Sequence, residues 1–282
     1  MTLYGLQPPV DRRTLHDAGV APGALLAPVL WMLGYPEQAL TSSQEVLARA
    51  QALAHPESIA LALDCATHVR QHRRETFATR QHAEALMVLA REQDFALRLA
   101  YGTILRGWAV SMQGQGYDGL QQIRQGEHAY QATGAAYERP YLLALQAEVE
   151  GNERHCSEAL QSIAAACTIV EHTGERRWEA ERYRLRGELR LTQAGPRQSV
   201  EGTGPQGEAA EACFQHALTI ARRQQAKSFE LRAAVSLSRL WQQQGTRAEA
   251  YELLAPIYGW FTEGFDTVDL QEAKTLLEEL EA

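Results

Sequence analysis

Residues 107–119 read GWAVSMQGQGYDG and hold the pattern that repeats through the chain. Gly107 and Gly119 are small residues twelve positions apart, and the turn signal Gly114-Gln115-Gly116 stands between them. Small residues let two helices approach closely where they cross, and a glycine-rich triplet ends one helix before the next begins. The stretch therefore predicts two antiparallel helices joined by a short turn.

Both glycines belong to series of small residues with a step of 40 positions. The first series contains Ala27, Thr67, Gly107, Ala147, Gly187 and, after a slip of eleven residues, Ser238. The second contains Ala39, Thr79, Gly119, Ala159 and, after the same slip, Ala210 and Ala250. A fixed period between 20 and 50 residues is the signature of stacked repeats that bury their apolar faces against their neighbours. We therefore expect one elongated repeat body.

Apolar residues follow the second series at spacings of four, seven and eleven, as in Ala250, Leu254, Ile257 and Phe261. These spacings place one apolar stripe on one helical face, and no segment has the pattern of a strand. The sequence thus predicts an all-α fold of about six antiparallel helix pairs.

The domain boundaries follow from the places where this pattern fades. We expect an irregular lead-in over 1–20, a repeat domain over 21–265 and a final amphipathic capping helix over 266–282. The eleven-residue slip coincides with a segment rich in glycine and proline. Because such residues do not continue a helix, we expect a loop insertion over 194–207.

The charge and hydrophobicity of the chain argue against nucleic acid and membranes as binding partners. The 282 residues include 27 Lys and Arg against 35 Asp and Glu, a formal net charge of −8, without the broad basic face that nucleic acid requires. The longest apolar stretch, Gly23 to Tyr35, is too short to cross a bilayer, and Met1 to Val10 is unlike a signal peptide. We expect a cytoplasmic protein that binds neither nucleic acid nor a membrane.

The helix pairs resemble the tetratricopeptide repeat, which implies a right-handed solenoid. The small residues at Gly107 and Gly187 match its first helix, and the stretch 245–250, GTRAEA, matches its inter-helix turn and second helix. A tetratricopeptide unit has 34 residues, whereas this one has 40, so the groove width and pitch are expected to differ.

Four phrases also resemble the C-terminal repeat region of bacterial regulators in which a class III nucleotide cyclase domain and a predicted NTPase domain come first. They are GTILRGWA (102–109), GERRWEAE (174–181), ARRQQAKS (221–228) and GWFTEGFDT (259–267). The resemblance covers most of the chain from about Leu30 onward and implies a sensing or docking role, with a cyclase or NTPase domain as one candidate partner. The chain has no G-x-x-x-x-G-K-[ST] loop, and no cofactor is expected.

The tetratricopeptide likeness assigns the concave surface to residues one, four and five places after the first-helix small residue and three and six places before it. The predicted groove residues are Trp31, Met32, Asp64, His68, His72, Tyr101, Trp108, Met112, Tyr141, Glu148, Arg184, Glu188, Arg232 and Arg239. Aromatic residues and methionines gather in the N-terminal half, and arginine and glutamate in the C-terminal half. Trp31 and Trp108 could equally fill the space between helices as core residues.

Asp64, His68 and His72 lie four residues apart on one helical face, a spacing that can bind zinc. No H-E-x-x-H motif accompanies them, and the alternative is a solvated polar face beside Arg70, Arg73 and Arg74. We therefore predict no metal site, with these three residues as the only candidate set.

The first functional hypothesis is an interaction or ligand-sensing module whose groove binds a peptide, a partner domain or a small molecule. The alternative is an enzyme or a metal- or small-ligand-binding protein that uses Asp64, His68, His72, Tyr101 and Trp108, with Tyr141 as a further chemical group. A third is an architectural spacer or homo-oligomer. No motif in the sequence names a reaction.

Overall fold

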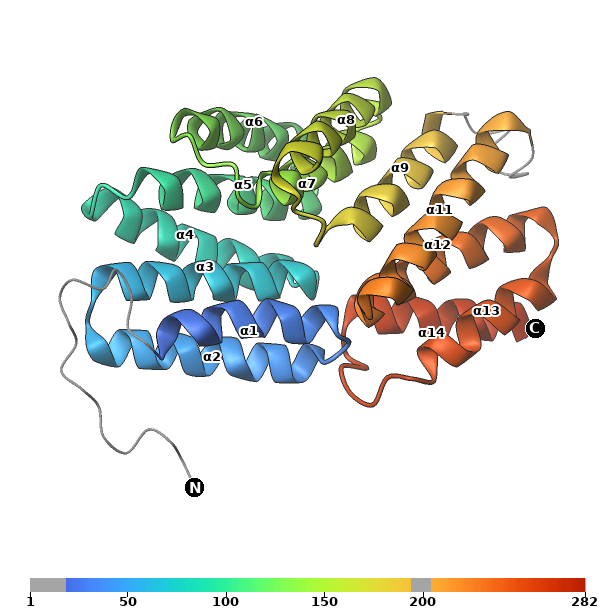
Figure 1. Ribbon diagram of the computed structural model, residues 1–282, viewed down its shortest axis with the longest axis horizontal. Helices are drawn as coiled ribbons and strands as arrows, with labels where there is room; N and C mark the ends of the chain where they lie inside the picture. Colours follow the sequence, from blue (N-terminus) through green and yellow to red (C-terminus); the bar gives the residue numbers. More distant parts are fainter. Residues whose placement is uncertain (1–18, 194–203, 282) are drawn as a thin grey trace.

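The computed structural model describes residues 19–193 and 204–281 (Figure 1). These residues form thirteen α-helices and no strand, so the all-α prediction is confirmed. The helices are α1 (Val20–Met32), α2 (Pro36–Leu53), α3 (Pro56–His72), α4 (Thr76–Glu92), α5 (Ala96–Met112), α6 (Gly116–Ala132), α7 (Arg139–Asn152), α8 (Cys156–Thr173), α9 (Glu179–Gln193), α11 (Pro205–Gln224), α12 (Lys227–Gln244), α13 (Arg247–Tyr258) and α14 (Val268–Glu281).

Consecutive helices pack in pairs, and the two series of small residues lie where the partners cross. All twelve members of the series are buried. A Cβ atom on Gly107 would lie 2.7 Å from the carbonyl oxygen of Gly119, so only glycine permits this approach of α5 to α6. In the last pair, the Ser238 hydroxyl donates to the carbonyl of Ala250 over 3.0 Å. The predicted contact between the two helices of a pair is therefore present in these two units.

The turns between helices also follow a fixed step. A residue with left-handed backbone angles recurs every 20 positions at Gly34, Ala54, Arg74, Asp94, Gly114, Gly134, Arg154 and Gly174, and again at Gln225 and Gly245. After most of them, the next N–H bonds back to a carbonyl five residues earlier, as from Phe95 to Ala90 over 2.9 Å. This bond satisfies a carbonyl at the helix end and reverses the chain.

The predicted boundaries need one correction. Helix α11 begins at Pro205, inside the predicted loop insertion over 194–207, because proline is well suited to the first turn of a helix. Residues 194–203, and residues 1–18 of the predicted lead-in, lie outside the described part. The predicted capping helix corresponds to α14, which packs its buried face against α12 and α13.

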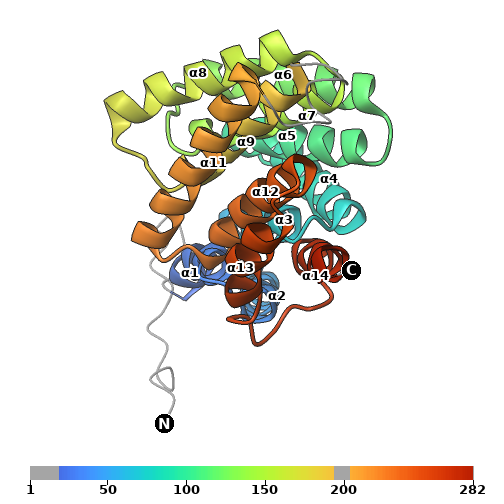
Figure 2. The ribbon, with the colours of Figure 1, turned by 90° about the vertical axis from the view of Figure 1, so that its right-hand side faces the viewer.

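The first and the last described helices are in contact through their neighbouring segments, which corrects the expectation of an elongated body. The loop between α13 and α14 contacts the first turn of α2: the Glu263 carboxylate accepts the backbone N–H groups of Glu37 and Gln38 at 2.9 and 3.1 Å. The Ser228 hydroxyl of α12 donates to the carbonyl of Trp31 in α1. Figure 1 shows one end of the α1–α2 pair next to the loop that leads to α14, and α1 also contacts α12 (Figure 2 shows the same helices from the side of α13 and α14). The row of helix pairs thus curves back on itself and encloses a centre.

None of the described helices combines the length and apolar character needed to cross a membrane.

Candidate functional site

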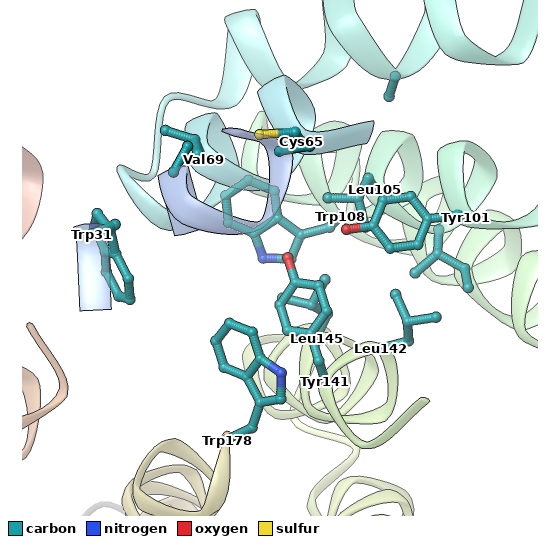
Figure 3. Close-up of a cluster of buried hydrophobic side chains, with 14 of the residues drawn as sticks. Trp31, Cys65, Val69, Tyr101, Leu105, Trp108, Tyr141, Leu142, Leu145 and Trp178 are labelled. Carbon is teal, nitrogen blue, oxygen red and sulfur yellow. The ribbon is translucent and has the colours of Figure 1, made fainter. Parts of the chain in front are cut away.

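Six rings fill part of the enclosed centre and form what we call the aromatic cluster. Its members are Trp31, His68, His72, Tyr141, Trp178 and Phe229. His68 stacks on Tyr141 with ring centroids 4.6 Å apart, and Tyr141 stacks on Trp178 at 4.5 Å. Figure 3 shows Trp31, Tyr141 and Trp178 extending toward the same region from α1, α7 and the segment before α9. Members of the cluster belong to the walls of two cavities.

The central cavity has a volume of about 290 Å³ and is lined by α3, α7, α9, α12 and α14. Half of the predicted groove residues line it together: His72, Tyr141, Glu148, Arg184, Glu188, Arg232 and Arg239. The sequence prediction missed Arg74, Trp178, Asp269 and Glu272, which also line it. The volume is close to the lower end of the range for small-molecule sites.

Ion pairs cover most of the polar wall of the central cavity. Arg184 donates from Nε and Nη2 to the two carboxylate oxygens of Glu181 over 2.9 and 2.7 Å. Burial alone would raise the pKa of Glu181, but Arg184 and Arg232 outweigh it and lower the pKa to about 2. Arg232 also bonds to Asp269 at 2.8 Å. Glu181 is therefore ionised, and its charge is met by two arginines.

Arg74 and Arg239 complete this network at the α14 side of the cavity. Arg74 lies 2.8 Å from Glu272 and 3.5 Å from Asp269, and Arg239 lies 3.5 Å from Glu272. Arg74 has a left-handed backbone, with φ of 59°, at a position where most of the other turns before a second helix have glycine. A residue other than glycine is strained in this backbone conformation. The Arg74 side chain nevertheless forms part of the cavity wall.

Glu148 differs from the other acidic residues of the wall. Within the described residues it has no lysine, arginine or histidine nitrogen within 4.0 Å, whereas the other four carboxylates each have an arginine. Its Oε2 atom instead accepts the indole N–H of Trp108 over 2.8 Å. The cavity therefore contains one carboxylate without an ion pair; Arg184 attracts it only from a longer distance and is paired with Glu181 and Glu188.

His72 contributes no positive charge to this wall. Burial holds its pKa well below the usual value, and the nearby His68 and Arg232 lower it further. Its Nδ1 atom lies 2.8 Å from Gln71 Oε1, which also accepts the Tyr141 hydroxyl at 2.8 Å. Because Gln71 Oε1 is an acceptor only, Nδ1 carries the proton and Nε2 is left as an acceptor. His72 is thus a neutral member of the site.

The side cavity, of about 120 Å³, brings together three other predicted residues, Asp64, His68 and Tyr101. The Tyr101 hydroxyl and His68 Nδ1 are 3.0 Å apart, and Arg98 pairs with Asp64. Burial raises the pKa of Asp64 to about 7, with Arg98 opposing the shift and Glu138 adding to it. These groups form a buried polar cluster rather than an open groove surface.

The metal candidate set is not assembled. Across the described ranges, no group of three or more His, Cys, Asp or Glu is arranged to hold a metal ion. Asp64 is paired with Arg98, while the ring of His72 packs on Trp31 at 4.4 Å. The alternative of a solvated face is also wrong, because His68 and His72 are 3% and 1% exposed. The closure of the chain buries this face of α3.

The structure places four predicted groove residues outside both cavities. Trp31 and Trp108 are 2% and 1% exposed, as in the alternative that made them core residues, and Met32 is buried as well. Met112 is half-buried, with its sulfur 3.8 Å from the Asn152 amide nitrogen. Trp108 nevertheless affects the central cavity, because its indole N–H binds the carboxylate of the cavity residue Glu148.

Comparison with known proteins gives no match to this chain, either among protein-family models or among curated proteins.

Proposed function

We propose that this protein is a binding module, a right-handed solenoid of tetratricopeptide-like helix pairs that holds a ligand in the central cavity. The period of 40 residues and the buried small residues support the repeat architecture. Six of the predicted groove residues, all from the last three units, supply part of the wall of the cavity. Part of the site therefore comes from the positions that tetratricopeptide-like pairs turn inward.

The observation that carries this proposal is the composition of the central cavity. Charged side chains from α7, α9, α12 and α14 converge on one space, together with leucines and the rings of Tyr141 and Trp178. A concave site with apolar walls and a few convergent polar groups is the usual form of a ligand site. Its size suits a small molecule or a single side chain of a peptide.

A regulatory role follows from the resemblance to repeat regions of cyclase and NTPase regulators. The cavity is lined by α3 from the N-terminal part of the described chain and by α14 from its C-terminal part. A bound ligand would contact both parts and so stabilise their closure. Occupancy would then be transmitted to a partner domain as a change in how firmly the two parts are held together.

The proposal is tested by filling the cavity. Ala144 is buried in its wall, so Ala144→Phe places a ring in the space, while Ala85→Phe adds the same ring at an exposed position on α4. Saturation-transfer NMR with mixtures of small metabolites and short peptides would detect ligands. We expect binders that are lost in A144F and retained in A85F.

Binders that are unaffected by A144F, or the absence of any binder, would contradict the proposal. Circular dichroism shows whether A144F folds; Val235→Phe fills the same cavity from α12 if it does not.

A further inference from the structure

We propose that the ligand of the central cavity carries an ammonium group and that Glu148 binds it. This inference rests on the proposed function, because it names the chemistry of the ligand in the same cavity. Four arginines and five carboxylates line the cavity, and His72 is neutral, so the wall has one negative charge in excess. Glu148 is the one carboxylate of this wall without an ion pair within 4.0 Å in the described part of the chain.

The excess charge is enclosed rather than spread over an outer surface. Glu148 is half-buried, and its neighbours in the wall include Leu145 and Leu185, which are 5% and 7% exposed. A partly desolvated carboxylate is costly unless hydrogen bonds or an opposite charge compensate it. The Trp108 N–H satisfies only Oε2, which leaves Oε1 for a donor that comes with the ligand.

Trp108 also fixes where that donor would bind. The indole is 1% exposed and packed in the core between helices, so its N–H has a fixed direction. The 2.8 Å hydrogen bond therefore restricts the rotation of the Glu148 carboxylate. A pre-oriented carboxylate loses less side-chain entropy when a ligand binds.

The same wall disfavours a ligand that carries only a negative charge. Arg184 is engaged by Glu181 through two hydrogen bonds, and Arg232 is shared between Asp269 and Glu181. Arg74 and Arg239 are likewise held by carboxylates of α14. An anion would have to break these pairs and would add to the existing negative charge. The leucines and the two aromatic rings suit the alkyl stem behind an ammonium group.

A short alkylammonium ion has this chemistry, and so does a lysine side chain of a peptide. The probes are n-butylammonium chloride and a glycine-rich peptide with a single lysine, compared with n-butanol and sodium butyrate as uncharged and anionic analogues. Calorimetric titration of the full chain gives the Kd of each. We expect one or both ammonium probes to bind and neither analogue to bind. The ammonium probe with the lower Kd shows whether the natural ligand is a small alkylammonium ion or a lysine side chain.

Glu148→Gln removes the charge but keeps an oxygen that accepts the Trp108 N–H, so the local structure is retained. Glu211→Gln is the matched control, because Glu211 is also half-buried and also accepts an indole N–H, from Trp241 over 3.1 Å, but lies outside the central cavity. We expect E148Q to weaken ammonium binding at least about tenfold, as for a lost charge-assisted hydrogen bond, and E211Q to change it less than about threefold.

Equal losses in E148Q and E211Q, or binding that does not distinguish butylammonium from butanol, would overturn the assignment of Glu148. The A144F variant distinguishes failure of the proposed binding function from failure of the ammonium assignment. A ligand that is lost in A144F but needs no ammonium group leaves the binding function standing and removes this inference, whereas no ligand at all removes both.

Discussion

The indole N–H of Trp108 donates to Glu148 Oε2 over 2.8 Å, and the two residues stand one period of 40 positions apart. Each directly follows a small residue of the first series, Gly107 and Ala147. The same position of two successive units is therefore joined across the inner face, with a core residue in one unit orienting a cavity residue in the next.

Trp108→Phe removes this donor and keeps most of the ring packing. We expect the free energy of unfolding to fall by about 1 kcal/mol, because one hydrogen bond to a half-buried carboxylate is lost. Trp108→Ala also leaves a large cavity in the core and is expected to cost about 3–5 kcal/mol. Urea denaturation checks both values, and similar losses for the two variants would contradict the role given to the N–H group.

Gly107→Ala tests the close crossing of α5 and α6. The added methyl group would lie 2.7 Å from the Gly119 carbonyl oxygen and 2.9 Å from Ile123 Cγ1, so the helices must separate. We expect a loss of about 1–3 kcal/mol from overpacking, although alanine favours a helix. Gly259→Ala is the control, since its methyl group would meet only the Ala255 carbonyl at 3.3 Å. Thermal unfolding compares the two, and a gain in stability for G107A would show that the crossing is looser than described.

Arg73 joins α2 to the loop before α14. Its guanidinium, 3% exposed, donates to the Pro36 carbonyl over 3.0 Å and to Asp266 over 3.2 Å. Arg73→Met leaves the Pro36 carbonyl without this donor, and we expect a loss of about 1–3 kcal/mol. Hydrogen exchange should accelerate at the amides of Glu37, Gln38 and Gly264, which bridge the same two segments.

The matched control for Arg73→Met is Arg80→Met. Arg80 belongs to an exposed i,i+4 pair with Glu84 and is expected to contribute only about 0.3–0.5 kcal/mol. If R73M left exchange at the three bridging amides unchanged, the closure would not depend on this residue.

Asp64 makes stability depend on pH. Burial raises its pKa to about 7, with Arg98 opposing and Glu138 adding to the shift. The folded state therefore retains a proton that the unfolded state releases, and the free energy of unfolding falls as pH rises from about 4 to about 7. Asp64→Asn is uncharged throughout. We expect the stability of the wild type relative to D64N to drop by about 2–3 kcal/mol between pH 5 and pH 8.

His68 and His72 act in the opposite direction, because burial lowers their pKa values and stability is lost as pH falls below about 6.5. Both proteins in the comparison carry these histidines, so their contribution largely cancels in the difference. A difference between wild type and D64N that stays constant from pH 5 to pH 8 would contradict the raised pKa. Urea midpoints across this range provide the measurement.

The helices and their pairing could be predicted from the sequence because the small residues are local markers of the contact between the two helices of a pair. Gly107 and Gly119 are twelve residues apart and touch in the fold. The closure between α2 and the loop before α14 could not be predicted in the same way. Glu37 and Glu263 are 226 residues apart, and their meeting depends on the small rotation between successive pairs, which no local pattern encodes.

In the candidate site, too, the residues on repeat positions could be predicted, whereas those that depend on the closure could not. Glu148, Arg184 and Arg232 were chosen by their distance from the small residues of the first series, and the structure brings them to one cavity because this distance is a property of each helix pair. Trp178 was missed because it stands nine residues before Gly187, ahead of the positions considered, although it lies in a phrase singled out for its resemblance. Asp269 was missed because it lies on α14, outside the repeat, and reaches the cavity only through the closure.

Binding of an ammonium group at Glu148 is tested most directly by the indole N–H resonance of Trp108, assigned with the W108F variant. During a titration with n-butylammonium chloride, we expect this resonance to shift together with that of Trp178, which lines the cavity, while those of Trp241 and Trp260 stay in place. A shift of Trp178 with Trp108 unmoved would place the ligand in the cavity but away from Glu148 and would contradict the assignment.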